Sequence, residues 1–165
     1  MTEKILIVMC GAPGSGKSTV ADEIASDFGF SIVCPDDIRE ELFGDASDQS
    51  QGWRVFQIAY DRLREGLWDN DIPGVIFDAT NCRRKARRDV LEEAGSAFDY
   101  AICAVSDADL DTCLAQNARR DRVVPDEVVE RMYSNLQQNW PDTSEGFDEV
   151  IYVDELYERA SALFR

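Results

Sequence analysis

Near the start of the chain, a loop of eight residues lies between an apolar run and a stretch with helical periodicity. Its residues match the pattern GxxxxGK[ST], and they are Gly11, Ala12, Pro13, Gly14, Ser15, Gly16, Lys17 and Ser18. Glycines let such a loop curl with its backbone N–H groups pointing inward, at a helix N-terminus whose dipole also favours phosphate. The alternative is a glycine-rich turn with an incidental lysine, and it is disfavoured because the full pattern and both flanks are present. The loop limits the chain to folds in which a buried strand leads through a phosphate-binding turn into a helix.

The side chains of this loop predict its ligand. Lys17 is expected to reach the β and γ phosphates of a nucleoside triphosphate, and the Ser18 hydroxyl is expected to hold Mg²⁺. Thr19 continues the loop into the helix and completes the expected nucleotide-binding set. ATP and Mg²⁺ are therefore the predicted cofactors, although the sequence leaves the preferred nucleotide base open.

Apolar runs alternate with amphipathic stretches along the chain, a pattern typical of an α/β domain with a mostly parallel sheet. Because parallel strands are buried on both faces, they read as continuous apolar runs. Strands are predicted at residues 5–10, 31–34, 75–77, 100–105 and 150–153. Helices are predicted at residues 18–28, 37–43, 53–68, 83–94, 107–118, 125–138 and 155–163, with Asp107 and Asp126 at helix starts. Surface loops are expected at 44–52 and 139–146, and a length of 165 residues fits one compact domain, 1–165.

Composition excludes several classes of protein. The chain has no histidine, so neither the commonest general base nor the commonest metal ligand is present, and a proton acceptor has to be a carboxylate. Five cysteines are scattered without a CxxC pair, which indicates neither a disulfide framework nor a zinc site. We expect most of them to be small core residues. No apolar stretch approaches the roughly 20 residues that span a bilayer, and no signal peptide is visible, so a soluble, cytoplasmic protein is expected.

The net charge of −16 arises from 33 acidic residues against 17 basic ones, of which only Lys4, Lys17 and Lys85 are lysines. A strongly acidic, lysine-poor surface is typical of proteins that stay soluble in high salt, because salt screens the repulsion. Ordinary acidity without adaptive meaning is the alternative. In either case the charge argues against a general binder of polyanions, since such binding depends on Lys and Arg. An anionic substrate has to be met by a local basic cluster.

Carboxylates follow two of the predicted strands, at the sheet edge where open α/β folds bind ligands. Asp36 and Asp37 come after the second strand, and Asp78 comes directly after the third. A carboxylate facing an acceptor hydroxyl can take its proton, and Arg39, one helical turn beyond Asp36, can hold an anionic group of that acceptor. Two competing interpretations stay open. In the first, Asp36 and Asp37 serve as helix caps and nothing more. In the second, Asp78 is a turn residue or positions magnesium-bound water.

Arg119, Arg120 and Arg122 lie together at the end of a predicted helix, just before Pro125. One interpretation is a solvated helix end whose positive charges suit the dipole. The other is a lid, at about 119–125, whose arginines neutralise charge on a transferring phosphoryl group. In the lid interpretation Arg120 is the first choice and Arg122 the second.

A second basic cluster occupies residues 83–88, at the start of a predicted helix. Positive charge is unfavourable at a helix N-terminus, so the cluster requires an anionic partner. That partner is either the protein's own carboxylates or a substrate.

Together these motifs resemble the polynucleotide kinase-like group of P-loop kinases, which includes the 5′-hydroxyl kinase module of polynucleotide kinases and small ATP-binding kinases. The resemblance spans nearly the whole chain. It rests on GAPGSGKST at 11–19, DDIR at 36–39, DATN at 78–81 followed by RKARR, NARR at 117–120 and EGFDEV at 145–150. It implies a three-layer fold with about five parallel strands, flanking helices and an arginine-bearing lid.

The resemblance also implies roles for residues at matching positions. Lys17 and Ser18 would contact the triphosphate and its metal, Asp36 would be the general base, and Arg39 would contact an acceptor phosphate. Asp78 matches an acidic position in the acceptor site with an open role. The lid arginine falls on Arg120, with Arg122 less securely aligned.

The resemblance indicates the reaction better than the acceptor. The leading hypothesis is an ATP-dependent kinase that acts on the 5′-hydroxyl of a polynucleotide or nucleotide. The alternatives are a kinase for a small metabolite or aminoacyl-tRNA, and a nucleotide-dependent switch or ATPase. The oligomeric state is not indicated by any feature of the sequence.

Overall fold

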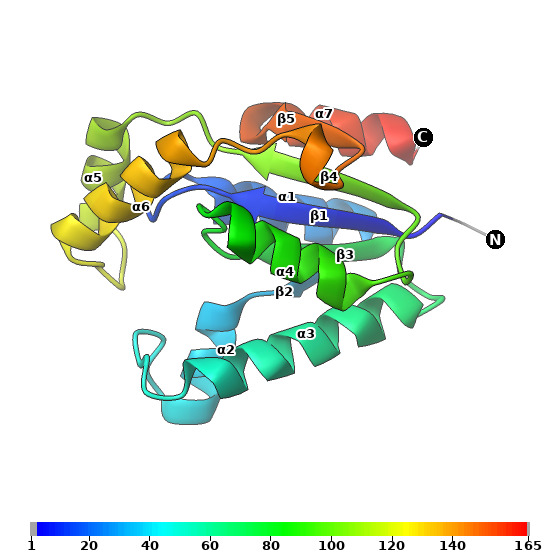
Figure 1. Ribbon diagram of the computed structural model, residues 1–165, viewed down its shortest axis with the longest axis horizontal. Coiled ribbons are helices and arrows are strands. Elements are labelled where there is room, and N and C mark those ends of the chain that lie inside the picture. The colour runs from blue at the N-terminus through cyan, green and yellow to red at the C-terminus, as the bar shows by residue number, and fades with distance from the viewer. Residues whose placement is uncertain (1–2, 165) are drawn as a thin grey trace.

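The computed structural model describes residues 3–164, and its centre is a five-stranded, all-parallel sheet (Figure 1). The strands are β1 (Ile5–Cys10), β2 (Ser31–Val33), β3 (Gly74–Asp78), β4 (Tyr100–Val105) and β5 (Glu149–Tyr152). Their order across the sheet is β2-β3-β1-β4-β5. β1 pairs with β3 on one side and β4 on the other, and all six of its residues are buried. The loop after β1 therefore leaves the middle of the sheet's carboxyl edge, where ligands of open α/β sheets bind.

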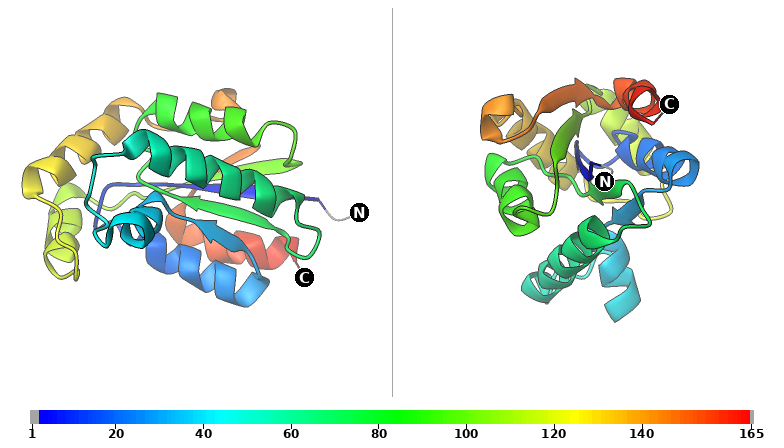
Figure 2. Two further views of the ribbon diagram at one scale, coloured as in Figure 1. Left: turned by 90° about the horizontal axis from the view of Figure 1, so that it is seen from below. Right: turned by 90° about the vertical axis from the view of Figure 1, so that its right-hand side faces the viewer.

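Helices lie on both faces of the sheet and complete a three-layer arrangement (Figure 2). They are α1 (Lys17–Phe28), α2 (Pro35–Phe43), α3 (Gly52–Trp68), α4 (Arg84–Ala94), α5 (Leu110–Ala118), α6 (Asp126–Gln138) and α7 (Val153–Leu163), with a short 3₁₀ helix, η1 (Thr143–Glu145). Leu6, Val8 and Cys10 of β1 join a core with α3 and α4. The intervening side chains of β1 join a second core with α1 and α7.

The apolar stripe of α3 shows how one helix is oriented on this framework. Val55, Ala59, Leu63 and Leu67 recur every fourth residue and are fully buried. Fully burying a Val or Leu side chain contributes about 1.5–3 kcal/mol, so this stripe sets the rotation of the helix. The neighbouring residue Phe56 then faces the open end of the sheet, where it lines a cavity.

The predicted fold class is confirmed: an α/β fold with five parallel strands and helices on both faces. The five predicted strands and seven predicted helices are all present, with ends that differ by a few residues. The loop at 139–146 differs more, because residues 143–145 of it form η1. None of the described helices is long and apolar enough to cross a membrane.

The helix predicted to start at Asp107 starts later. Its first residue is Leu110, and Asp109 is the N-cap, since the Asp109 side chain accepts a hydrogen bond from the Thr112 backbone N–H. Upstream, the Ser106 hydroxyl accepts from the Ala108 N–H at 3.2 Å and holds the residues after β4 in a turn. The prediction for Asp126 is confirmed, because α6 begins at that residue.

Candidate active site

The loop at residues 11–18 forms the predicted turn between β1 and α1. Gly14 and Gly16 have φ values of +82° and +85°, which favour glycine. A Cβ on Gly14 would lie 2.2 Å from the Cys113 carbonyl oxygen, so α5 packs directly on the loop backbone. Gly16 is the N-cap of α1 and supplies no side-chain capping bond, which leaves the first N–H groups of α1 available to a ligand.

The loop residues fit a bound phosphate. A cavity of about 210 Å³ is lined by the loop from Gly14 to Thr19 and by Gln116 and Arg120. The Ser15 hydroxyl is buried without a hydrogen-bond partner, and buried polar atoms are rarely left so. Within residues 3–164, no group of three or more Cys, Asp or Glu side chains is arranged to hold a metal ion. A magnesium ion here would be held by Ser18 together with phosphate oxygens.

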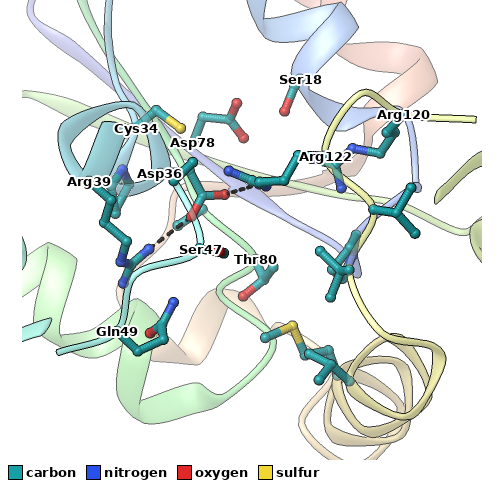
Figure 3. Close-up of a pocket in the computed structure, with 18 of the residues that line it drawn as sticks. Ser18, Cys34, Asp36, Arg39, Ser47, Gln49, Asp78, Thr80, Arg120 and Arg122 are labelled. Atoms are coloured by element: carbon teal, nitrogen blue, oxygen red, sulfur yellow. Dashed lines mark hydrogen bonds and ion pairs between the residues drawn. The ribbon is translucent and has the colours of Figure 1, made fainter. Parts of the chain in front are cut away.

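A larger cavity of about 490 Å³ adjoins the loop and collects most of the predicted site residues (Figure 3). Lys17 and Ser18 line it from the start of α1, Asp36 and Arg39 line it from α2, and Asp78 lines it as the last residue of β3. Arg120 and Arg122 line it from the segment between α5 and α6. Parallel strands place their carboxyl ends at one edge, which is why residues so far apart in the sequence meet here.

The Asp36 carboxylate accepts hydrogen bonds from two guanidinium groups. Arg39 Nη1 donates to its Oδ1 at 2.8 Å, and Arg122 Nη2 donates to its Oδ2 at 2.7 Å. The competing helix-cap interpretation is not supported for Asp36, because Cys34 occupies the N-cap position of α2 and no side chain makes a capping bond there. Asp36 instead lies in the first turn of α2, with its carboxylate between Arg39 and Arg122 (Figure 3).

Arg39 and Asp78 are buried but keep unused hydrogen-bonding atoms. Arg39 is 7% exposed and its Nε has no partner, while its guanidinium carbon lies 5.8 Å from the centre of the Phe56 ring. Asp78 is 5% exposed and its Oδ1 has no partner. Both side chains line the cavity, and buried polar atoms are rarely left without a partner, so the two residues are candidates for contact with a ligand.

The environment of Cys34 reflects the local charge. Burial, followed by the charges of Asp78 and Asp37, raises the pKa of the Cys34 thiol to about 11. Cys34 lines the cavity and is half-buried, whereas the other four cysteines are buried and all five are free. The expectation that most cysteines are core residues is confirmed.

The lid segment, residues 119–125, is held at its base by a buried asparagine. Asn117 Nδ2 donates to the Val124 carbonyl at 2.7 Å, and its Oδ1 accepts from the Val124 N–H at 3.2 Å. Arg120 lines both cavities, whereas Arg122 lines only the larger one. Burial, and then the charge of Arg122, lower the pKa of Arg120. A guanidinium in that setting is suited to an incoming anion.

Several cavity residues were missed by the sequence analysis. Ser47 and Gln49 come from the segment that was predicted only as a surface loop, and Arg131 and Met132 come from α6. No local signal marks them, because their contribution depends on how α6 and the α2–α3 loop pack over the strand ends. Together with Lys17, Arg39, Arg120 and Arg122, Arg131 makes the lining predominantly basic despite the acidity of the chain.

The second basic cluster is used within the protein, and none of its members lines either cavity. Arg87 pairs with Glu145 at 2.8 Å and Lys85 pairs with Asp89 at 2.8 Å. Arg84 lies 3.9 Å from Glu145. Of the two predicted partners, the protein's own carboxylates are the ones observed for these three side chains.

The central parallel sheet and its glycine-rich loop define an α/β protein with a P-loop kinase-like fold. More particularly, the chain belongs to the AAA_33 family, described as an AAA domain, which matches residues 6–139. The predicted resemblance to polynucleotide kinase-like P-loop kinases is confirmed by the structures that share this fold.

Three solved structures illustrate the likeness. A chain of the Pnkp1/Rnl/Hen1 RNA repair complex is 24% identical with a TM-score of 0.71, over 90% of this chain and 47% of that one. A fungal RNA kinase is 20% identical with a TM-score of 0.60, over 92% and 75%. A gluconokinase from Sinorhizobium meliloti is 18% identical with a TM-score of 0.61, over 99% and 93%.

A relative known from its sequence is the Arabidopsis thaliana protein named transcription factor bHLH140. It is 26% identical over an alignment of 162 positions, which covers 91% of this chain and 16% of that protein. The chain thus spans about half of the RNA repair chain and about one sixth of the Arabidopsis relative.

Proposed function

We propose that this protein is a kinase that transfers the γ-phosphoryl group of ATP to an acceptor hydroxyl, and that the acceptor is the 5′-hydroxyl of a polynucleotide or nucleotide. The observation that carries the proposal is one cavity lined by Lys17 and Ser18 and also by Asp36, Arg39 and Asp78. A nucleotide-dependent switch has no need for an acid and arginine pair opposite its phosphate site. The arrangement therefore favours transfer to a second substrate over simple hydrolysis.

In this proposal the P-loop and the lid hold the nucleotide. The backbone of residues 11–16 surrounds the phosphates, and Lys17 and Arg120 neutralise charge on the transferring group. Magnesium bound beside Ser18 would supply further positive charge to the phosphates. Arg120 has the better position of the two lid arginines, because it borders both the P-loop cavity and the larger one.

The strand ends hold the acceptor. Asp36 takes the proton of the attacking hydroxyl, since each of its oxygens keeps a second lone pair beside the arginine bond. Arg39 binds an acceptor phosphate with its guanidinium group, since the residue lines the cavity. Asp78, which also lines the cavity, orients the acceptor or a magnesium-bound water.

A small metabolite or an aminoacyl-tRNA is the competing acceptor. The net charge of −16 favours a small acceptor, because affinity for long nucleic acids comes from neutralising many phosphates. The basic side chains lie around the cavity, where they could neutralise one small anionic ligand.

The test is transfer from γ-labelled ATP to a panel of acceptors: DNA and RNA with 5′-hydroxyl ends, nucleoside 3′-monophosphates, nucleosides, tRNA and sugar acids. We expect label on the 5′-hydroxyl acceptors. Lys17→Ala should abolish this transfer while the protein stays folded, because it removes charge from the phosphoryl oxygens and no packing. Label only on non-nucleotide metabolites or on tRNA would replace the acceptor, and release of labelled phosphate alone would reject the kinase proposal.

Arg39→Ala tests the acceptor contact. Loss of a charge-assisted hydrogen bond to a buried arginine weakens binding by about 10- to 100-fold. We therefore expect the acceptor KM to rise by that factor, while the KM for ATP stays unchanged. A nucleoside 3′-monophosphate should show this loss, whereas a plain nucleoside should lose little because it never makes the contact. Equal responses would make Arg39 structural and favour the small-metabolite acceptor.

A further inference from the structure

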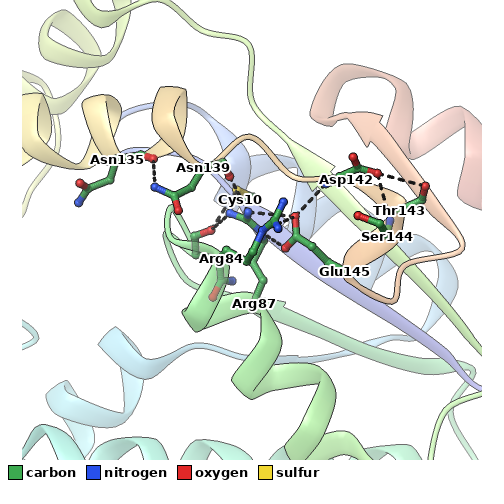
Figure 4. A network of polar contacts seen from close by, with 10 residues as sticks. Cys10, Arg84, Arg87, Asn135, Asn139, Asp142, Thr143, Ser144 and Glu145 are labelled. Atoms are coloured by element: carbon green, nitrogen blue, oxygen red, sulfur yellow. Dashed lines mark hydrogen bonds and ion pairs between the residues drawn. The ribbon is translucent and has the colours of Figure 1, made fainter.

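Arg87 of α4 is fully buried, yet it lines neither cavity. All five of its N–H donors have an acceptor (Figure 4). Nε and Nη2 bond the two Glu145 oxygens at 2.8 and 3.1 Å, and Nη2 also bonds the Asn139 carbonyl. Nη1 bonds the Asn81 carbonyl at 2.9 Å and lies 3.9 Å from Cys10 Sγ. One side chain thus joins η1, the end of α6, the end of β1 and the turn after β3.

The turn at residues 78–81, which begins at the last residue of β3, is the part of this network that reaches the candidate active site. Asn81 has a φ of +46° and is the only non-glycine residue between 3 and 164 with a positive φ. Its Nδ2 donates to the Met9 carbonyl at 2.7 Å, and the Gly11 N–H donates to the Thr80 carbonyl at 2.9 Å. The turn that carries Asp78 is therefore tied to the residue at which the P-loop begins.

Glu145 is itself held in place. Its side chain is 2% exposed, and its Oε2 also accepts from the Asp142 N–H at 2.8 Å as part of the η1 capping box. A buried ion pair is poor evidence for stability, because the cost of removing two charges from water offsets their attraction. Apolar residues of similar volume in the same place often give equal or greater stability. What the pair provides is a defined geometry: a planar fork with a fixed acceptor for each donor.

We propose that Arg87 and Glu145 are a positioning pair, which holds the turn at residues 78–81 against the start of the P-loop. The pair thereby sets the separation between the acceptor carboxylate Asp78 and the phosphate site. The effect on phosphoryl transfer rests on the proposed function, whereas the position of the turn does not.

The test compares variants on one helix. Arg87→Met removes the fork, Arg87→Lys keeps the charge without the fork, and Arg87→Met with Glu145→Leu removes both charges. Lys85→Met is the matched control, because Lys85 forms an exposed ion pair with Asp89 on the same helix. If Arg87→Met alone fails to fold, the double variant carries the test, since it leaves no unpaired buried charge.

The first readout is amide hydrogen exchange on the two sides of β1. The Gly11 N–H bonds Thr80 on the β3 side, and the Ser106 N–H bonds the Cys10 carbonyl at 2.8 Å on the β4 side. We expect the double variant to speed exchange of Gly11 at least about tenfold more than that of Ser106, because local opening and global unfolding differ in their protection. Lys85→Met should leave the ratio of the Gly11 exchange rate to the Ser106 exchange rate unchanged. Equal changes at Gly11 and Ser106 would overturn the proposal.

The second readout compares the change in kcat with the change in the dissociation constant for ATP, at a temperature where each variant is folded. We expect kcat to fall about 10- to 100-fold in the double variant, since misplacement by about 1 Å costs up to that factor. The dissociation constant for ATP should stay near the wild-type value, and Arg87→Lys should fall between. If the double variant regains the wild-type kcat whenever it regains the wild-type melting temperature, the loss comes from instability, and a positioning role is contradicted. If the wild-type protein phosphorylates no acceptor, the proposed function fails, and the exchange ratio still decides this inference.

Discussion

Two carboxylates at the cavity differ in how their oxygens are used. Both oxygens of Asp36 accept hydrogen bonds from arginines, one from α2 and one from the lid. Asp78 is more deeply buried, and one of its oxygens has no partner. The roles we propose follow from this difference: Asp36 is the base that takes the proton of the acceptor hydroxyl, whereas Asp78 orients the acceptor or a magnesium-bound water.

The first prediction separates these two roles by isosteric substitution. Asp36→Asn keeps the shape but cannot take the proton, so kcat should fall by about 10² to 10⁴ while ATP binding persists. Asp78→Asn should act mainly on the acceptor KM or on the Mg²⁺ requirement, with a smaller loss in kcat. Steady-state kinetics and equilibrium ATP binding measure both. The opposite order of kcat losses would assign the base to Asp78.

The second prediction concerns the thiol of Cys34, whose pKa is raised to about 11 by burial and nearby carboxylates. The thiolate is the reactive form, so alkylation by iodoacetamide should be slow at pH 7 and rise about tenfold per pH unit toward pH 11. Mass spectrometry of the labelled peptide gives the rate. The unfolded chain is the control, because its thiols titrate near 8.5. A plateau near pH 9 in the folded protein would contradict the assigned environment.

At the scale of elements, the lid is a short segment in which Arg120 lines both cavities and Arg122 lines only the larger one. The Asn117 side-chain amide donates to and accepts from the backbone of Val124, which ties the end of α5 to the end of the lid segment. Arg122 reaches Asp36, which lies 86 positions earlier in the sequence. The Arg120 guanidinium has no partner among the hydrogen bonds and ion pairs of the described residues, and Arg120 borders the phosphate loop.

The third prediction follows from that division. Arg120→Ala should lower kcat about 10²- to 10³-fold with little change in the dissociation constant for ATP, as expected for a contact made in the transition state. Arg122→Ala should lower kcat less, because its partner in this structure is Asp36. Arg119→Ala, at an exposed position of the same segment, is the control. A loss of ATP affinity with kcat preserved would show that Arg120 binds the ground state instead.

At the scale of the whole molecule, charge is unevenly placed. The chain carries −16, yet five side chains that line the large cavity are basic and two are acidic. Exposed arginines pair with carboxylates, as Arg62 does with Glu41 and Arg64 with Glu93, but the surplus of 16 acidic charges remains after all basic residues are counted. The surface therefore repels itself while the cavity stays suited to an anionic ligand.

The fourth prediction is that salt stabilises this protein. Raising NaCl from 0.1 to 1 M shortens the screening length from about 10 to about 3 Å and weakens the repulsion between surface carboxylates. We expect the melting temperature to rise by several degrees, and to rise less in an uncharged osmolyte of equal osmolality. A flat or falling melting temperature would mean that the acidity has no stabilising response to salt, as in the alternative of ordinary acidity.

Local patterns were sufficient to predict the elements and the phosphate-binding turn. The apolar run before Gly11, the glycines and Lys17 act through neighbours in the chain, so their consequences are local and visible in the sequence. The amphipathic stretch at 53–68 was likewise predicted as a helix, and the structure shows the buried stripe that orients it. Short-range signals were less reliable at element ends: the helix predicted to start at Asp107 starts at Leu110, with Asp109 as its N-cap.

The partners of the charged side chains were decided only by the tertiary structure. The sequence alone established a basic cluster at 83–88, but the packing of α4 against η1 paired Arg87 with Glu145, 58 positions away. It equally placed Arg122 on Asp36 and brought Arg131 to a cavity that no local pattern connects with α6. The physical reason is range: hydrogen-bonding turns and helical periodicity act over a few residues, whereas a buried charge takes whichever partner the stacked layers bring within about 3 Å.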